Sequence, residues 1–321
     1  MSTPSPTTPV APPGDLGEAA ARRTGLLAGT CAYALWGVFP LVFRLLQSVS
    51  AVEILLHRVV WSFAVVVVLL LVRRERGWYD SVRARPGALR RLALAGALVA
   101  SNWLVYIWAV NNDHVVEAAL GYYINPLITV AIGVAVLGEQ LRRLQVVALG
   151  FGVLAVVVLT VAYGRVPWIA IVLSLTFAGY GYLKRSVPVG AVTSLAVETA
   201  VLLPAALVGL VVLGVAGDPA FGGASVGRDA LMVGLGVITA VPLLLFGTAA
   251  TRIPLSTLGL LQYLTPTLQL LCGVVLLGEP LPPERLAGFV LVWIALGALA
   301  TDALGGPRRR RGAQAPVLEP T

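Results

Sequence analysis

Ten stretches of this chain are apolar over about 20 residues each, the length that an α-helix needs to cross the roughly 30 Å hydrocarbon core of a bilayer. Inside lipid the backbone must satisfy its own hydrogen bonds, so such stretches fold as helices. The composition, with 58% hydrophobic and 12% charged residues, is also far from that of a soluble domain. The sequence therefore predicts an all-α integral membrane protein with ten transmembrane helices. They are expected at 25–46, 52–72, 89–110, 115–137, 143–162, 166–183, 190–213, 229–249, 254–277 and 284–304.

The positions of the basic residues predict how these helices are oriented, because loops rich in Lys and Arg stay in the cytoplasm. If the N-terminus lies inside, 18 of the 23 Lys and Arg residues fall on the cytoplasmic side. Residues 1–24 are rich in proline and are expected to form a disordered tail, and residues 305–321 a basic tail. Both tails, and hence both termini, are predicted to be cytoplasmic.

One segment of the chain occurs twice. A shift of 140 residues superposes 120–141 on 260–281, with nine of the 22 positions identical. The identical pairs include Pro126 with Pro266 and Glu139 with Glu279. The repeat unit is then five helices, and an odd number of crossings inverts the second unit in the bilayer. The predicted units are 25–162 for helices 1–5 and 166–304 for helices 6–10. Inverted repeats are typical of secondary transporters, whose two halves expose one central site to either side in turn.

Polar residues of the repeated segment are hypothesised to line a substrate cavity. In the first copy they are spaced at i, i+3 and i+7, which places them on one helical face. At this depth they should face other helices or water, and the two prolines are expected to break the helices and free a carbonyl nearby. Alternatively, the stripe only hydrogen-bonds neighbouring helices. The stripe comprises Tyr122, Asn125 and Thr129 with their counterparts Gln262, Thr265 and Gln269, and the predicted helix breaks are Pro126 and Pro266.

Charged residues inside the membrane are the second group of candidates. Glu198 lies eight residues into its predicted helix, about 12 Å from the inner end, where an ionised carboxylate needs a partner or water. It is predicted either to act in gating or proton coupling, or to pair structurally with Lys184 or Arg185. Another set is expected at the outer surface, as a gate of exchangeable ion pairs or as residues that only snorkel to water. This set comprises Glu53, His57, Arg58 and Glu117, with Arg44, Asp113 and His114 nearby.

Aromatic and amide side chains along the first and third helices could stack on a flat or cationic substrate. The candidates for the cavity are Asn102, Tyr106, Trp103 and Trp36. Packing is the competing interpretation of these residues, and Trp108 and Trp168 are expected to anchor the membrane interface. Glu139 and Glu279, at the ends of the repeated segment, are expected to cap the following helix or anchor the turn.

Five stretches carry a resemblance to a known family. They are "EILLHRVVWSF" (53–63), "NWLVYIWAVNN" (102–112), "EAALGYYINPL" (117–127), "PLLLFGTAATRIPLSTLGLLQYLTPTL" (242–268) and "VWIALGALATDAL" (292–304). The repeated segment resembles the EamA domain repeat of the drug/metabolite transporter superfamily, and the whole chain is similar to its RarD subgroup. The resemblance spans nearly everything between the tails. It implies ten helices, a carrier in the plasma (inner) membrane, and export of small metabolites such as amino acids or of drug-like compounds.

Other classes of function fit the sequence less well. Two histidines without a catalytic or metal-binding motif argue against an enzyme, and the lack of a Walker A motif argues against direct use of ATP. A channel would not need inverted halves, although a channel or a non-transporting membrane protein stays the alternative. The arginines fall in short clusters between apolar runs, which does not indicate a nucleic-acid surface. The expected partners are a small-molecule substrate and the lipid bilayer, with no cofactor and no metal.

Overall fold

The computed structural model describes residues 13–74, 77–137, 140–187, 189–217, 219–223, 225–250, 252–253, 257 and 261–311. Throughout these residues the regular secondary structure is helical. Eight helices are long and apolar enough to cross a membrane, and two shorter apolar helices, Trp168–Lys184 and Leu264–Leu276, lie between them in the chain. The prediction of an all-helical, multi-pass membrane protein is confirmed.

The eight long apolar helices and α8 lie at nine of the expected spans, and one short extra helix, α4, follows the second of them. Of the expected span 254–277, α12 and η1 cover 264–276. Local signals mark several ends: the Ser50 side chain accepts the Glu53 N–H at the start of α3, and Gly164 ends α7 with a φ of 65°. In chain order the helices are α1 (Pro13–Gly37), α2 (Phe39–Arg44), α3 (Ala51–Val72), α4 (Trp78–Arg83), α5 (Ala88–Asn111), α6 (Val115–Leu137), α7 (Arg143–Tyr163), α8 (Trp168–Arg185), α9 (Ala191–Ala216), α10 (Val226–Ala250), α12 (Leu264–Leu271), the π-helix η1 (Cys272–Leu276) and α13 (Pro283–Arg311).

The two ends of the chain differ from the expectation. Helix α1 begins at Pro13 and α13 continues to Arg311, so both reach into the segments expected as tails. The expectation of disorder otherwise falls on residues 1–12, which lie outside the described residues. The first span is also interrupted, because Pro40 at the start of α2 has no N–H to continue the hydrogen-bond ladder of α1. The first span is therefore two helices.

The prolines of the repeated segment do not act alike. Helix α6 runs through Pro126 without interruption, so the helix break expected there is absent. The proline removes one hydrogen bond, and contacts with neighbouring helices hold the rest of α6 together. Pro266 instead lies in the first turn of α12, where its missing N–H costs no helical bond. The α-helix then ends at Leu271 and continues as the π-helix η1, so the ninth span is not a uniform α-helix.

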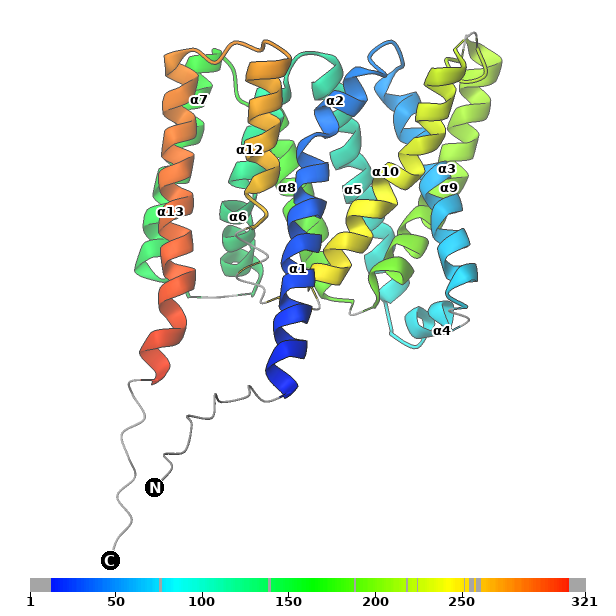
Figure 1. The fold of residues 1–321 in the computed structure, drawn as a ribbon. Helices are drawn as coiled ribbons and strands as arrows, with labels where there is room; N and C mark the ends of the chain where they lie inside the picture. Colours follow the sequence, from blue (N-terminus) through cyan, green and yellow to red (C-terminus); the bar gives the residue numbers. More distant parts are fainter. Residues whose placement is uncertain are drawn as a thin grey trace, which may run out of the picture.

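The helices form one bundle (Figure 1). Helices α3, α5, α9 and α10 pack together on one side, and α7 and α13 pack against each other on the opposite side. Between them, α6 contacts α8 and α12, and α1 contacts α10 and α12. Helix α1 begins and α13 ends on the same side of the bundle (Figure 1). The contacts of α6 and α12 thus bring the two copies of the repeated segment together in the interior.

Two glycines allow helices to approach closely near this interior. A Cβ at Gly236 of α10 would lie 2.4 Å from the carbonyl oxygen of Trp61 on α3, and one at Gly121 of α6 would lie 2.9 Å from that of Ala170 on α8. Small residues at such crossings are how membrane helices pack backbone against backbone. The two crossings fix the distance of α10 from α3 and of α6 from α8.

Candidate functional site

The polar stripe of α12 faces α1. Thr265 Oγ1 donates to the Tyr33 carbonyl at 2.9 Å, and Gln269 Nε2 donates to the Trp36 carbonyl at 3.2 Å. Both polar side chains are buried. The third member of the stripe, Gln262, is half-buried in the turn before α12, where its carbonyl accepts the Thr265 N–H. Two of the three polar side chains therefore hold α12 against the backbone of α1.

The polar stripe of α6 faces α5 and α8. The Tyr122 hydroxyl donates to Asn102 Oδ1 at 3.0 Å, and Asn102 Nδ2 donates to the Leu173 carbonyl and to Thr176 Oγ1. Thr129 is exposed rather than turned toward these helices, and its Oγ1 donates within its own helix to the Asn125 carbonyl. Sequence patterns placed Asn102 beside the cavity, but nothing in them singled out Thr176. A threonine inside an apolar run gives no signal until its partner helix is known.

Three buried polar atoms in this region have no hydrogen-bond partner among the described residues. They are Asn125 Oδ1, Gln269 Oε1 and the Tyr106 hydroxyl. Each belongs to a side chain that is at most 5% exposed. A buried polar atom without a partner is costly, so natural proteins rarely keep one without a reason. The polar region in the centre of the bundle therefore has unused hydrogen-bonding capacity on α5, α6 and α12.

Aromatic rings surround this polar centre. Trp36 contacts Tyr33 and Phe246 at centroid distances of 5.5 and 5.9 Å, and Tyr106 contacts Tyr122 at 5.7 Å. By contrast, the rings of Trp108 and Trp168 contact each other at 5.4 Å and are 37% and 40% exposed. These last two lie on the surface, where membrane-interface anchors are found.

Arg58 is 4% exposed and lies among aromatic rings. Its guanidinium carbon is 4.0 Å from the Trp103 ring centroid and 5.6 Å from that of Phe43. Its Nε donates to Thr239 Oγ1 on α10 at 3.0 Å. Among the described residues, none of the ion pairs within 4.0 Å includes Arg58. Arg58 is therefore not part of the ion-paired outer gate expected from the sequence.

The other members of the expected outer gate have separate partners. Glu53 accepts the Phe221 N–H at 3.1 Å, and His57 Nδ1 accepts the Trp61 indole N–H at 3.2 Å. Glu117, which is 1% exposed, pairs with Arg165 at 2.7 Å and accepts the Ile169 N–H. The expected set thus divides into local contacts, because Glu117 lies against the start of α8 and Glu53 against the loop before α10.

One exposed ion pair and one buried carboxylate complete this end of the bundle. Arg44 pairs with Asp113 at 2.6 Å and links α2 to the turn before α6. Glu279 accepts the N–H groups of Val115 and Val116 at 2.6 and 2.8 Å. It therefore caps α6 rather than the helix that follows it, and its counterpart Glu139 lies outside the described residues.

Glu198 lies at the other end of α8. Its carboxylate accepts the Ser194 hydroxyl at 2.6 Å and the Tyr180 hydroxyl at 3.3 Å, and lies 3.3 Å from Lys184 Nζ. The Lys184 ammonium also donates to the Tyr180 hydroxyl. Of the two partners considered from the sequence, the structure brings Lys184 to the carboxylate. Glu117 and Glu198 are thus buried carboxylates held at opposite ends of α8.

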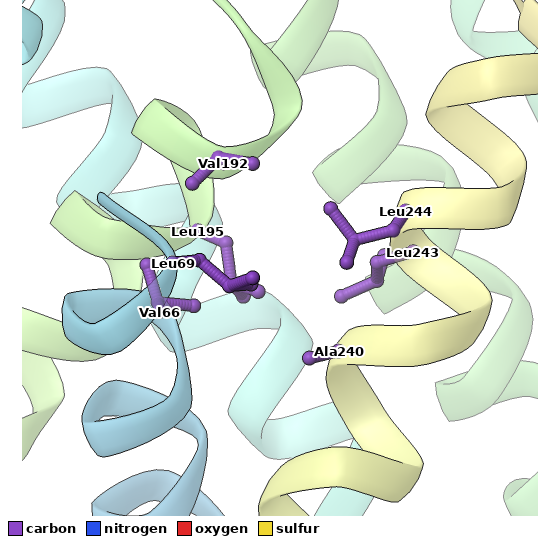
Figure 2. Close-up of a pocket in the computed structure, with 7 residues that line it drawn as sticks. All are labelled: Val66, Leu69, Val192, Leu195, Ala240, Leu243 and Leu244. Atoms are coloured by element: carbon purple, nitrogen blue, oxygen red, sulfur yellow. The ribbon is translucent and has the colours of Figure 1, made fainter. Parts of the chain in front are cut away.

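A small pocket lies apart from the polar centre, between α3, α9 and α10 (Figure 2). Its walls are exclusively aliphatic, so they offer no group that could orient a polar ligand. None of its residues is among the sequence-predicted site residues. They are Val66, Leu69, Val192, Leu195, Ala240, Leu243 and Leu244. The polar centre is the better candidate for a functional site.

Several membrane-crossing helices around buried polar residues define the class of multi-pass membrane proteins. Comparison with known proteins agrees. Residues 23–161 match the EamA-like transporter family. The chain is 52% identical to Protein RarD of Streptomyces exfoliatus (90% of this chain and 92% of the relative) and 39% identical to Protein RarD of Escherichia coli K12 (91% and 99%). It is also 39% identical to an uncharacterized transporter of Vibrio cholerae (91% and 97%).

This chain belongs to the EamA-like transporter family, in its RarD group, and is a membrane transporter. A solved crystal structure also matches this chain, with a TM-score of 0.58 and 22% sequence identity. The match covers 90% of this chain and 99% of the chain in that structure. At that identity the match shows a shared fold alone. The resemblance inferred from the sequence motifs is confirmed.

Proposed function

We propose that this protein is a secondary transporter of the plasma membrane that exports a small metabolite, such as an amino acid, or a drug-like compound by alternating access. Its architecture would be ten transmembrane helices in two inverted five-helix repeats, with both termini cytoplasmic. The export direction and the membrane follow from the resemblance to the family. The observation that carries the proposal is the buried part of the two polar stripes, formed by Asn125 on α6 and by Thr265 and Gln269 on α12, with unpartnered oxygens on Asn125 and Gln269.

The contacts between helices support the inverted repeat. The 140-residue shift pairs α1 with α8, α3 with α9, α5 with α10, α6 with α12 and α7 with α13. Under this exchange the contact of α6 with α8 becomes that of α12 with α1, and the contact of α5 with α8 becomes that of α10 with α1. The contact of α3 with α10 likewise becomes that of α9 with α5. Two halves that pack in equivalent ways can exchange conformations at low cost.

The two ion pairs of α8 are candidates for the gates. Arg165 and Glu117 join the start of α8 to α6, and Lys184 and Glu198 join the end of α8 to α9. Alternating access needs one closure on each side of the central site, and each closure must open in turn. In this proposal the outward-open state separates Arg165 from Glu117, and the inward-open state separates Lys184 from Glu198. Glu198 would also carry the coupled proton.

Counterflow in proteoliposomes tests the proposal. The purified protein is reconstituted in vesicles that are preloaded with a mixed pool of amino acids and small metabolites, and exchange is followed by mass spectrometry. If the protein is a carrier, one class of compound should exchange in a saturable way, at a rate above that in protein-free vesicles. Conduction without exchange would indicate a channel, and covalent change of a compound would indicate an enzyme. Absence of exchange, conduction and conversion by folded protein would contradict the proposal.

A further inference from the structure

Arg58 is a buried cation whose charge is not matched by an anion of the described chain. It lies about 10 Å along α3 from its first residue, at 1.5 Å per residue. Arginine stays protonated in proteins, so burial cannot remove its charge. Its Nε reaches Thr239, and no hydrogen bond of the two Nη atoms occurs among the described residues. Four N–H donors of the guanidinium are therefore unused.

The carboxylates at this end of the bundle make their printed contacts to groups other than Arg58. Glu53, about one turn before Arg58 on α3, accepts the Phe221 N–H. Asp229 at the start of α10 accepts the Gly222 N–H through Oδ2, while its Oδ1 has no partner among the described residues. Glu117 is held by Arg165. The aromatic rings around the guanidinium offset part of its lost hydration by cation–π contact, but rings cannot accept its in-plane hydrogen bonds. A buried guanidinium in this state favours binding of an anion.

The Tyr106 hydroxyl is a second unused polar group beside Arg58. The Phe43 ring contacts both, with its centroid 5.6 Å from the guanidinium carbon and 6.0 Å from the Tyr106 ring. A phenol can donate to an anion, as an arginine does. An anion held by Arg58 would thus find a second donor in Tyr106.

We propose that the transported solute carries a carboxylate and that Arg58 binds it, with Tyr106 as a second donor; this inference rests on the transporter function proposed above. A single guanidinium matches a singly charged anion, whereas a phosphate dianion calls for more than one cation. The planar fork of arginine also fits the two oxygens of a carboxylate in a bidentate pair. The substrate class is therefore organic monocarboxylates.

Binding to matched acids and amides tests the proposal. The full chain in phosphatidylcholine nanodiscs is heated in the presence of 3-phenylpropanoate, hexanoate or N-acetyl-leucine, each beside its uncharged amide. We expect at least one acid to raise the unfolding midpoint in a saturable way while its amide does not. Arg58→Gln should weaken binding of the acid at least about tenfold, and Arg58→Lys should weaken it less. The control Arg90→Gln, at an exposed arginine, should bind the acid as the wild type does.

Each other result has a defined meaning. Equal binding of acids and amides, failure of all three acids, or unchanged binding in Arg58→Gln would overturn the proposal. The proposal would also be overturned if inorganic phosphate bound more tightly than the three acids. Competition of phosphatidylglycerol with the acids that depends on Arg58 would overturn it as well, because it would assign the site to a lipid headgroup. If Arg58→Gln does not fold, the proposal is still tested by whether the wild type binds the acids in preference to their amides. Acid binding without counterflow would uphold the anion site while contradicting the transporter proposal.

Discussion

The Tyr122 hydroxyl donates to Asn102 Oδ1 at 3.0 Å, which ties the polar stripe of α6 to α5. Tyr122→Phe removes this donor and leaves a buried amide oxygen without its partner. Hydrogen bonds between membrane helices contribute modestly, so we expect a loss of about 0.5–1.5 kcal/mol in the free energy of unfolding. Equilibrium unfolding in detergent measures the loss. Tyr79→Phe, at an exposed tyrosine, is the control and should leave stability unchanged.

Asn125→Ala and Gln262→Ala are predicted to lower the counterflow rate at least about tenfold, or ~1.4 kcal/mol in the barrier, without preventing membrane insertion. The reason is that the stripe offers polar groups to a solute, such as the unpartnered Asn125 Oδ1. Thr160→Ala is a matched control, because Thr160 bonds only within peripheral helix α7. Wild-type rates in both stripe variants would show that the stripe is structural.

Glu198→Gln is predicted to remove the pH dependence of transport and also to destabilise the protein, because Lys184 then lacks its carboxylate partner. Adding Lys184→Met should recover stability, with a coupling of about 0.5–3 kcal/mol between the two sites. The pH dependence should stay absent in the double variant if Glu198 carries the proton. Its return in the double variant would show that Glu198 serves only as the partner of Lys184.

Two ion pairs on the same side of the bundle should differ in their energetic contribution. Arg165→Gln leaves Glu117, which is 1% exposed, without its cation, and should cost about 1–3 kcal/mol. Arg44→Gln disrupts a pair whose carboxylate is 63% exposed, and should cost less than about 1 kcal/mol. Unfolding of the two variants side by side checks the difference. Equal losses would contradict the assignment of Glu117 as the buried partner.

Glu279 should make stability depend on pH in acid. Burial raises the pKa of Glu279 above its ordinary value of 4.5, although two backbone N–H groups oppose the shift. In the window between the ordinary and the raised pKa, the folded protein binds more protons than the unfolded chain. The free energy of unfolding therefore falls as pH rises through that window and is level above it. Unfolding of wild type and Glu279→Gln across this range should show the slope only in the wild type.

The sequence was sufficient to predict the eight helices that are long and apolar enough to cross a membrane, because a helix in lipid must be apolar for a fixed length. The interruption at Pro40 could not be predicted from the proline alone, because α6 runs through Pro126 without a break. The partners of the charged residues were harder to predict from the sequence. Lys184 lies 14 residues from Glu198 across one turn, and was one of the two partners considered from the sequence. Arg165 lies 48 residues from Glu117 with α7 between them, and only the packing of α8 on α6 brings the two together.

The sequence pointed to the residues of the candidate site but not to their partners. The repeat identified α6 and α12, because duplicated polar residues in apolar helices are unusual. It did not show that Thr265 and Gln269 bond to backbone carbonyls of α1, or that Arg58 lies on Trp103 and forms none of the ion pairs seen among the described residues. Such contacts depend on which helices cross and at what depth, and the spacing of residues within one helix does not contain that information.

The central claim is that the stripe of α6 and α12 lines a path open to each side in turn. The most direct test is thiol accessibility at Asn125→Cys and Gln269→Cys, in a background where Cys31 and Cys272 are replaced by Ala. A membrane-impermeant reagent is applied from the outside or from the inside of oriented vesicles. We predict labelling from both sides, slowed by the exchanged solute. Cysteines at both positions that never react, in folded protein, would contradict the claim.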